Sequence, residues 1–296
     1  MRNGLLEGVR TLWRRGLGLS GTESSMANGT LRLYPPPPHV MSRCEIAALA
    51  GVRLDGTCPV CGEHCQFYPF TENMRESGRC SRCGASNRQR QMAWMLRHEL
   101  GLPGDGELVV PPGVAIYNTE ANGPLHEILK AHPLYQCSEY WGDKSEFGER
   151  VNGVRNEDLQ ALSFEAMIFD VVLSSDVLEH MPSPYLAHSE ICRVLKPGGK
   201  HIFTVPYGES MVRDDVRASL VDGVVVNHAE ALYHGDPVRP DEGILVWTIF
   251  GLEMLVRLSE IGFQTELWQL HEPAQGIVGP GAIVFSAQRR VGPGAG

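Results

Sequence analysis

Four cysteines offer the most specific chemistry in this chain of 296 residues. They form two pairs of the same spacing, Cys58 with Cys61 and Cys80 with Cys83, and eighteen residues separate the pairs. Each pair can present two thiolates from one tight turn, and four thiolates make a closed tetrahedral zinc site. Because such a site has no open coordination position, the spacing predicts a structural Zn2+ rather than a catalytic one.

The turns around these cysteines belong to a predicted zinc-ribbon module with flanking helices, residues 41–100. Gly62 and Gly84 follow the second cysteine of each pair, where a tight turn needs a permissive backbone. His64 and Cys65 are alternative ligands that would break the symmetry of the pairs. Nearby arginines can form a solvated face, pair with the acidic main domain or bind a phosphate-bearing substrate. They are Arg75, Arg79, Arg82, Arg88 and Arg90.

A second group of reactive side chains lies in the carboxyl-terminal half of the chain. His180 has a pKa near neutrality and can act as a general base, or it can organise a helix start together with Glu179. His234 and Asp236 flank a glycine and could form a base with its orienting acid, a substrate clamp, or simply a turn. Tyr207 adds a further hydroxyl to these catalytic candidates.

The elements that must position these groups are best marked between residues 167 and 206. Residues 167–175 form a short apolar, β-branched run of the kind that is buried in a parallel sheet. A helical pattern follows over residues 184–195, and the sequence KPGGK at 196–200 ends it. Residues 201–206 read as the next strand. The order strand, helix, turn and strand indicates an α/β fold.

Three pieces of this stretch, FD before the first strand, LEH after it and RVLKPGG before the second, resemble the signature of class I S-adenosylmethionine-dependent methyltransferases, in particular the methyltransferase type 11-like group. The resemblance covers about residues 113–290. It implies a Rossmann-like, doubly wound sheet of seven strands, which the segments 264–270 and 282–288 would complete as an antiparallel pair. It also implies S-adenosyl-L-methionine as the cofactor and a methyltransferase enzyme.

The same resemblance implies a set of cofactor-binding residues at the carboxyl ends of the strands. Glu139 takes the place of the acid that accepts hydrogen bonds from the ribose hydroxyls, and Asp158 with Leu159 takes the place beside the adenine. Ser174 and Ser175 would lie where the methyl group is transferred. The first turn contributes Asn118, Thr119, Glu120 and Gly123.

That first turn departs from the family pattern, because Gly123 is the only one of the usual glycines that remains. Asn122 can cap the following helix, and Pro124 suits its first turn. The start of that helix would still present free N–H groups to the methionine carboxylate.

Two further segments flank the predicted domain. Residues 1–40 form an arm with helical apolar spacing followed by a linker that ends in four prolines. The arm can pack on the body, join a second subunit in a homodimer, or lie on a membrane surface. Residues 206–241 are too long and too polar for a simple connection and are predicted to cap the substrate pocket.

Bulk composition narrows the functional classes. The net charge of −9 and the pI of about 5.7 argue against a general nucleic-acid coat protein. The sequence has no apolar run long enough to span a bilayer and no secretory pattern at its start, so a cytoplasmic location is expected. Paired cysteines in such a compartment favour metal over disulfides.

The sequence therefore predicts S-adenosylmethionine-dependent methyl transfer to an oxygen or nitrogen of a small molecule or saccharide. One alternative is an RNA methyltransferase, because a four-cysteine ribbon before such a domain resembles the ribosomal-RNA guanine methyltransferases. The acidic charge and the lack of an aromatic ladder make a nucleic-acid partner the weaker reading. The other alternative is a non-catalytic scaffold, suggested by the degenerate glycine turn.

Overall fold

The computed structural model describes most of the chain from residue 51 onward and two short backbone segments before it. The described residues are 23–26, 29–33, 49, 51–142, 145–235, 243–279 and 281–292. The predictions for the first arm, for the four prolines, for most of the helix at 41–52 and for Asp236 lie outside these residues. Within them, no helix combines the length and the apolar character needed to cross a membrane.

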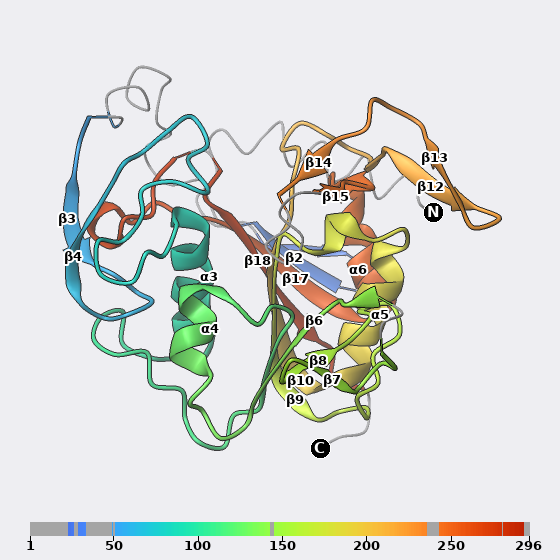
Figure 1. Cartoon of the computed structure of the whole chain (residues 1–296), viewed down its shortest axis with the longest axis horizontal. Helices are drawn as coiled ribbons and strands as arrows, with labels where there is room; N and C mark the ends of the chain where they lie inside the picture. The colour runs from blue at the N-terminus through green and yellow to red at the C-terminus, as the bar shows by residue number, and fades with distance from the viewer. Residues whose placement is uncertain are drawn as a thin grey trace.

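A mixed sheet forms the centre of the described molecule (Figure 1). Its ten strands run in the spatial order β1, β2, β17, β18, β10, β9, β5, β6, β8 and β7. Their bounds in that order are Glu23–Met26, Gly29–Leu33, Phe263–Gln269, Ile283–Arg289, Leu195–Thr204, Phe169–Ser175, Ile116–Asn118, Tyr135–Glu139, Val154–Asn156 and Arg150–Val151.

Seven neighbouring strands of this sheet, from β8 to β17, are those that the sequence predicts. The first five are mutually parallel, whereas β18 runs antiparallel to both β10 and β17. This order and this antiparallel pair confirm the Rossmann-like class I methyltransferase fold. Asp170, which the FD sequence contributes, fixes the sheet locally by accepting hydrogen bonds from the Ala115 N–H at 2.8 Å and the Lys196 Nζ at 2.6 Å.

Extra strands extend both edges of the predicted sheet. At one edge β7 forms a tight hairpin with β8. At the other edge β1 and β2 form a hairpin, and β2 pairs in parallel with β17. Both strands lie within the segment that the sequence predicts as a linker. Met26 pairs with Gly29, which is the first residue of β2.

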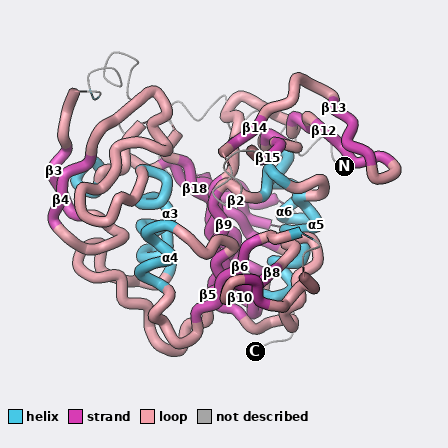
Figure 2. The backbone as a smooth tube through the Cα atoms, viewed as in Figure 1, coloured by secondary structure: helices cyan, strands magenta, loops and turns pink. Residues whose placement is uncertain are grey.

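Two helices cover each face of the sheet (Figures 1 and 2). On one face lie α3 and α4, and on the other lie α5 and α6; their bounds are Asn87–Glu99, Gly123–Leu129, Pro184–Val194 and Glu253–Ile261. The alternation of β9 explains both layers: Val171 and Leu173 face the α3 side, while Val172 between them faces the α5 side.

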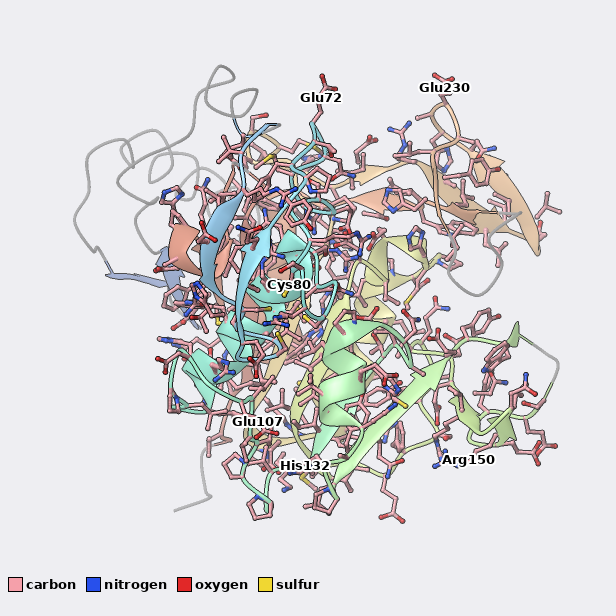
Figure 3. The ribbon with its side chains drawn as sticks, turned by 60° about the vertical axis from the view of Figure 1, so that its left-hand side comes forward. Glu72, Cys80, Glu107, His132, Arg150 and Glu230 are labelled. Carbon is pink, nitrogen blue, oxygen red and sulfur yellow. The ribbon has the colours of Figure 1, made fainter. Side chains whose placement is uncertain are left out.

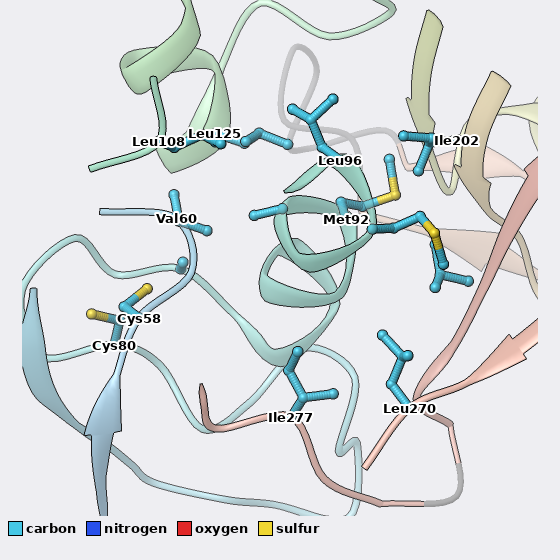
Figure 4. Packing of buried hydrophobic residues seen from close by; sticks show 14 of the residues in the cluster. Cys58, Val60, Cys80, Met92, Leu96, Leu108, Leu125, Ile202, Leu270 and Ile277 are labelled. Carbon is cyan, nitrogen blue, oxygen red and sulfur yellow. The ribbon is translucent and has the colours of Figure 1, made fainter. Parts of the chain in front are cut away.

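The cysteine module packs onto the α3 face and shares its core. Strands β3 (Leu54–Thr57) and β4 (His64–Phe67) form a hairpin whose connection carries Cys58 and Cys61. Buried residues of the module and of α3 belong to the same apolar cluster as Ile202 in the sheet (Figure 4). Helix α3 starts in a capping box, in which Ser86 and Gln89 exchange hydrogen bonds. The module is thus part of the layer that buries one face of the sheet.

Short strand pairs fill the segment between β10 and α6. They are β11 (Asp215–Val216) with β16 (Thr248–Ile249), β12 (Ala218–Val221) with β13 (Val224–Asn227), and β14 (Tyr233–His234) with β15 (Ile244–Leu245). The β12–β13 hairpin projects from the body (Figure 1). The Trp247 N–H donates to the Glu179 carbonyl at 2.7 Å, so this segment returns to the chain that follows β9.

Candidate functional site

A cavity of about 1040 Å³ opens beyond the carboxyl ends of β5, β6 and β9. Three parts of the chain line it: the turns after the strands, the cysteine module, and the segment with the short strand pairs. This is the edge of an open α/β sheet at which ligands bind. The cavity is large enough for a nucleoside-sized cofactor together with a small acceptor.

Eight of the residues that the sequence assigns to catalysis or cofactor binding line this cavity. They are Thr119, Glu120, Glu139, Asp158, Leu159, Ser175, His180 and His234. Four other described candidates are not among the lining residues, namely Asn118, Gly123, Ser174 and Tyr207.

Local geometry explains why these four side chains lie elsewhere. The Asn118 Nδ2 donates to the Tyr135 hydroxyl at 3.0 Å, inside the protein. Ser174 faces the opposite side of β9 from Ser175, and its hydroxyl lies 2.9 Å from Nε2 of buried His201. The alternation of side chains along a strand makes this inevitable for two consecutive serines.

The remaining two are held by other constraints. The Tyr207 hydroxyl is buried without a hydrogen-bond partner, and its ring packs on Phe285 with 5.4 Å between centroids. Gly123 opens α4 with a φ of 82°, and a Cβ there would lie 2.9 Å from Nε2 of Gln89. Its role is to let the turn pass close to α3.

Glu139 ends β6 and organises the turn that replaces the glycine-rich loop. Its Oε1 accepts from the Ala121 N–H at 2.8 Å and from the Asn122 Nδ2 at 2.9 Å. Asn122 therefore holds the turn rather than capping α4, whose N-cap has no side-chain hydrogen bond. Because a carboxylate offers about four acceptor positions, Glu139 can still accept from a ligand.

Glu120 is the most perturbed acid of this turn. Its pKa is raised to about 7, mainly by burial; the carboxylates of Glu139 and Asp176 contribute to the rise, and Arg88 opposes it. The side chain lines the cavity. A cationic ligand would therefore stabilise its ionised form.

Two arginines of the cysteine module reach into the same cavity and bind Asp176, which follows β9. Arg75 Nη2 lies 2.7 Å from Asp176 Oδ1, and Arg88 Nε lies 3.4 Å from Oδ2. Thr204 also donates to Asp176 at 2.9 Å, and Arg88 donates to the Ser175 hydroxyl. Burial alone would raise the pKa of Asp176, but the two guanidinium groups lower it below its ordinary value. The module thus supplies part of the cavity wall.

Sequence reasoning placed these arginines in one group but could not separate their roles. Arg90 is buried and donates to the Gly276 carbonyl at 2.7 Å, with its guanidinium 4.5 Å from the centre of the Phe67 ring. Arg75 lies 101 residues from its partner Asp176. No local pattern in the sequence predicts the contact between Arg75 and Asp176.

Glu179, His180 and His234 meet at another wall of the cavity. Glu179 and His180 belong to a single 3-10 turn, η3 (Leu178–His180), and His234 comes from β14. His234 Nδ1 lies 3.2 Å from His180 Nε2 and 3.5 Å from Glu179 Oε1, and His180 Nε2 lies 3.6 Å from the same oxygen. The rings of the two histidines meet edge to face. Glu179 is fully buried, which raises its pKa to about 7. The sequence reading treated Glu179 only as part of a helix start.

The four predicted zinc ligands come together in the module. Their sulfur atoms all lie within 4.8 Å of one another, with 3.8 Å between Cys58 and Cys83 and 4.0 Å between Cys61 and Cys80. Tetrahedral zinc with Zn–S bonds of about 2.3 Å requires sulfur separations of about 3.8 Å. His64 and Cys65 are not part of this group. Cys80 lies in the module between β4 and α3 (Figure 3).

Comparison with known proteins adds the family. Residues 137–203 match the family model described as "Methyltransferase domain". This stretch runs from β6 to β10 and includes Glu139, Asp158 and Ser175. This part of the chain matches a methyltransferase domain, and the sheet that contains it has the class I methyltransferase fold. No curated protein matches the sequence.

Several solved structures are similar to this chain. An S-adenosylmethionine-dependent methyltransferase from Mesorhizobium loti is 16% identical, with a TM-score of 0.43, over 69% of this chain and 99% of that chain. The 1,6-didemethyltoxoflavin-N1-methyltransferase of Burkholderia thailandensis, solved with 1,6-didemethyltoxoflavin and S-adenosylhomocysteine, is 16% identical, with a TM-score of 0.40, over 69% and 79%. A putative methyltransferase in complex with the Haloferax volcanii Trm112 activator is 14% identical, with a TM-score of 0.41, over 69% and 92%. At these scores none of them indicates an acceptor for this methyltransferase.

Proposed function

We propose that the cavity binds S-adenosylmethionine and that the enzyme transfers its methyl group to an oxygen or nitrogen of a small molecule or saccharide. The observation that carries this proposal is the opening of Glu139 and Asp158, from the ends of successive strands, into one cavity. Glu139 would accept from the ribose hydroxyls. Asp158, with Leu159 beside it, would accept from the adenine amine.

The residues of the first turn fit the methionine end of the cofactor. The Thr119 hydroxyl is buried and has no hydrogen-bond partner among the described residues, so a ligand amine or carboxylate would satisfy it. Glu120 stands next to it, and its carboxylate would pair with the methionine ammonium group. Ser175 would lie at the methyl end. These contacts replace what the missing glycines supply, which supports an enzyme over a non-catalytic scaffold.

The acceptor would lie against the segment that carries His234, which we propose to be the capping part of the pocket. His180 Nδ1 lies 2.9 Å from the Leu245 carbonyl, so its other ring nitrogen is directed at His234. A simple base role for His180 would require this pair to separate. The cofactor carries the driving force of methyl transfer, so the enzyme mainly has to align the acceptor and exclude water.

We further propose that the four cysteines bind a structural Zn2+ and that residues 41–100 serve the domain at 113–290. The sulfur separations support zinc, and the shared core explains why the module is needed. A reduced four-cysteine site also favours a cytoplasmic location. An RNA acceptor has less support, because Arg90 is buried in the core and Arg75 and Arg88 line the cavity, which leaves only Arg79 and Arg82 of this arginine group exposed.

Calorimetry with S-adenosylmethionine and S-adenosylhomocysteine tests this function. We expect micromolar binding of both ligands, and Glu139→Ala should weaken it about tenfold or more, since a hydrogen bond to a charged group contributes about 1.5–3 kcal/mol. Glu165→Ala removes an exposed glutamate at another part of the surface and should leave the affinity unchanged. Absence of binding at about millimolar ligand would refute the enzyme. A steep salt dependence of RNA binding would favour the RNA acceptor instead.

A further inference from the structure

The group formed by Glu179, His180 and His234 has the composition of a metal site. Two imidazole nitrogens and one carboxylate oxygen face one another, and the three atoms lie within 4.8 Å of one another. Both histidines line the cavity, whereas the carboxylate lies behind them and is fully buried. The two histidines thus form part of the wall of the pocket.

The carboxylate of Glu179 is the observation that calls for a ligand. Neither of its oxygens accepts a hydrogen bond, although both are buried. A buried charge without a partner is costly, and nature normally pairs it or places it on a metal. Among the described residues, the ion-pair partners of Glu179 are the imidazoles of His180 and His234, which are charged only when protonated. Arg75 and Arg88 pair with Asp176 instead.

The second observation is the way in which His180 is held. Its Nδ1 lies 2.9 Å from the Leu245 carbonyl, which fixes the tautomer with the proton on Nδ1. The lone pair of Nε2 then points to the group. A metal-binding histidine is typically oriented in this way, by a backbone carbonyl at its other nitrogen.

The third observation is the size of the triangle that the three atoms form. Its edges measure 3.2, 3.5 and 3.6 Å. Tetrahedral ligands at about 2.0–2.1 Å from a metal lie about 3.3–3.4 Å from one another. An ion placed near the centre would thus reach all three atoms with little movement of the side chains.

We propose that Glu179, His180 and His234 bind a divalent first-row metal ion, such as Mn2+ or Zn2+, and that its open positions receive an oxygen of the acceptor. Three protein ligands with an open position are the pattern of a catalytic rather than a structural site. The acceptor role rests on the proposed methyl transfer, but the site itself does not. It narrows the acceptor to a hydroxyl or another oxygen-bearing group.

The ion would activate such an acceptor by lowering the pKa of its hydroxyl, as it does for bound water. The hydroxyl proton passes to solvent, and the oxygen then forms the new O–CH3 bond. The C–S bond of the sulfonium breaks at the same time, and its electron pair remains on sulfur. The products are the methyl ether and S-adenosylhomocysteine, so no oxidant or reductant is needed.

Mn2+ is the appropriate probe for this site, because it prefers oxygen and nitrogen ligands and leaves the four-thiolate site to zinc. The full chain is titrated with Mn2+, and bound and free ion are separated by electron paramagnetic resonance. We expect one Mn2+ per chain for the wild type. Glu179→Gln and His234→Ala should each weaken binding at least tenfold. His228→Ala is the matched control, since His228 lies in the same segment but contacts Ser219.

Two measurements guard against misfolding and against a surface site. S-adenosylhomocysteine affinity and the melting temperature are recorded for every variant, and spin-echo modulation of Mn2+ on the wild type reports nitrogen ligands without any substitution. Imidazole nitrogen couplings support the site. Three results would overturn the proposed site: no Mn2+ binding up to about 1 mM, bound Mn2+ without nitrogen couplings, or folded variants that bind Mn2+ as tightly as the wild type. Cofactor binding without metal binding would overturn this inference alone. Metal binding without cofactor binding would overturn the proposed function and the acceptor role of the ion, but not the metal site.

Discussion

Replacing Glu120 by glutamine should stabilise the protein, and more so as the pH rises. The pKa of this carboxyl rises from about 4.5 to about 7 on folding, mainly because the cavity wall buries it. Below pH 4.5 the side chain is protonated in both states, and the wild type bears no penalty. Between the two values the unfolded chain loses its proton first, so wild-type stability falls as the pH rises. Above pH 7 the penalty is complete, and the rise of the pKa from about 4.5 to about 7 corresponds to at most about 3–4 kcal/mol.

The assay is urea unfolding of wild type and Glu120→Gln at several pH values between 5 and 8. We expect the variant to gain stability relative to the wild type across this range and to exceed it by about 1–3 kcal/mol at pH 8, since cavity water screens part of the effect. Groups that titrate in both proteins cancel in the difference. A gap that stays constant with pH would refute the assignment of this pKa to Glu120.

Two further predictions concern the cysteine module. Cys80→Ser should lower the zinc content and weaken S-adenosylhomocysteine binding about tenfold or more, because the module holds Arg75 and Arg88 against Asp176. Metal analysis measures the zinc content, and calorimetry measures the affinity. Zinc-free protein that binds with full affinity would contradict this prediction. Gly62→Ala should lower the melting temperature far more than Gly84→Ala. Both glycines have positive φ, but a Cβ at Gly62 would lie 2.2 Å from the Gly106 carbonyl oxygen. A Cβ at Gly84 would have no heavy atom within 4 Å. Equal melting temperatures would contradict the close approach.

The sequence predicts the sheet well because its central strands are short apolar runs that can be recognised from their own residues. The run at 167–175 is apolar on both faces, as a central strand must be, and it becomes β9. The cysteine spacing predicts the four-sulfur group for a similar reason, since each pair lies in one turn. The edge hairpin was not predicted, because residues 23–33 lie in a stretch that reads as a polar linker.

The site could be predicted only in part, because it depends on contacts between distant segments. Glu139 and Asp158 are placed in the cavity by the strand ends that carry them. Ser174 is turned away by the pleat of β9, a distinction that a resemblance between families does not resolve. Arg88 donates to Ser175, which lies 87 residues away in the sequence. The sequence does not show that Glu179 belongs to the site, because His234 reaches it only through the packing of β14. Such juxtapositions are properties of the packing.

The β1–β2 hairpin affects the tendency of the protein to self-associate through the edge of its sheet. Strand β17 would otherwise be a border of the sheet, with a row of N–H and C=O groups available to any neighbouring molecule. Because β2 pairs there with Glu266 and Leu267, the border moves to β1, a strand of only four residues, and such a short edge strand limits edge-to-edge pairing. A variant that lacks this hairpin would expose the backbone N–H and C=O groups of β17 and would self-associate more readily.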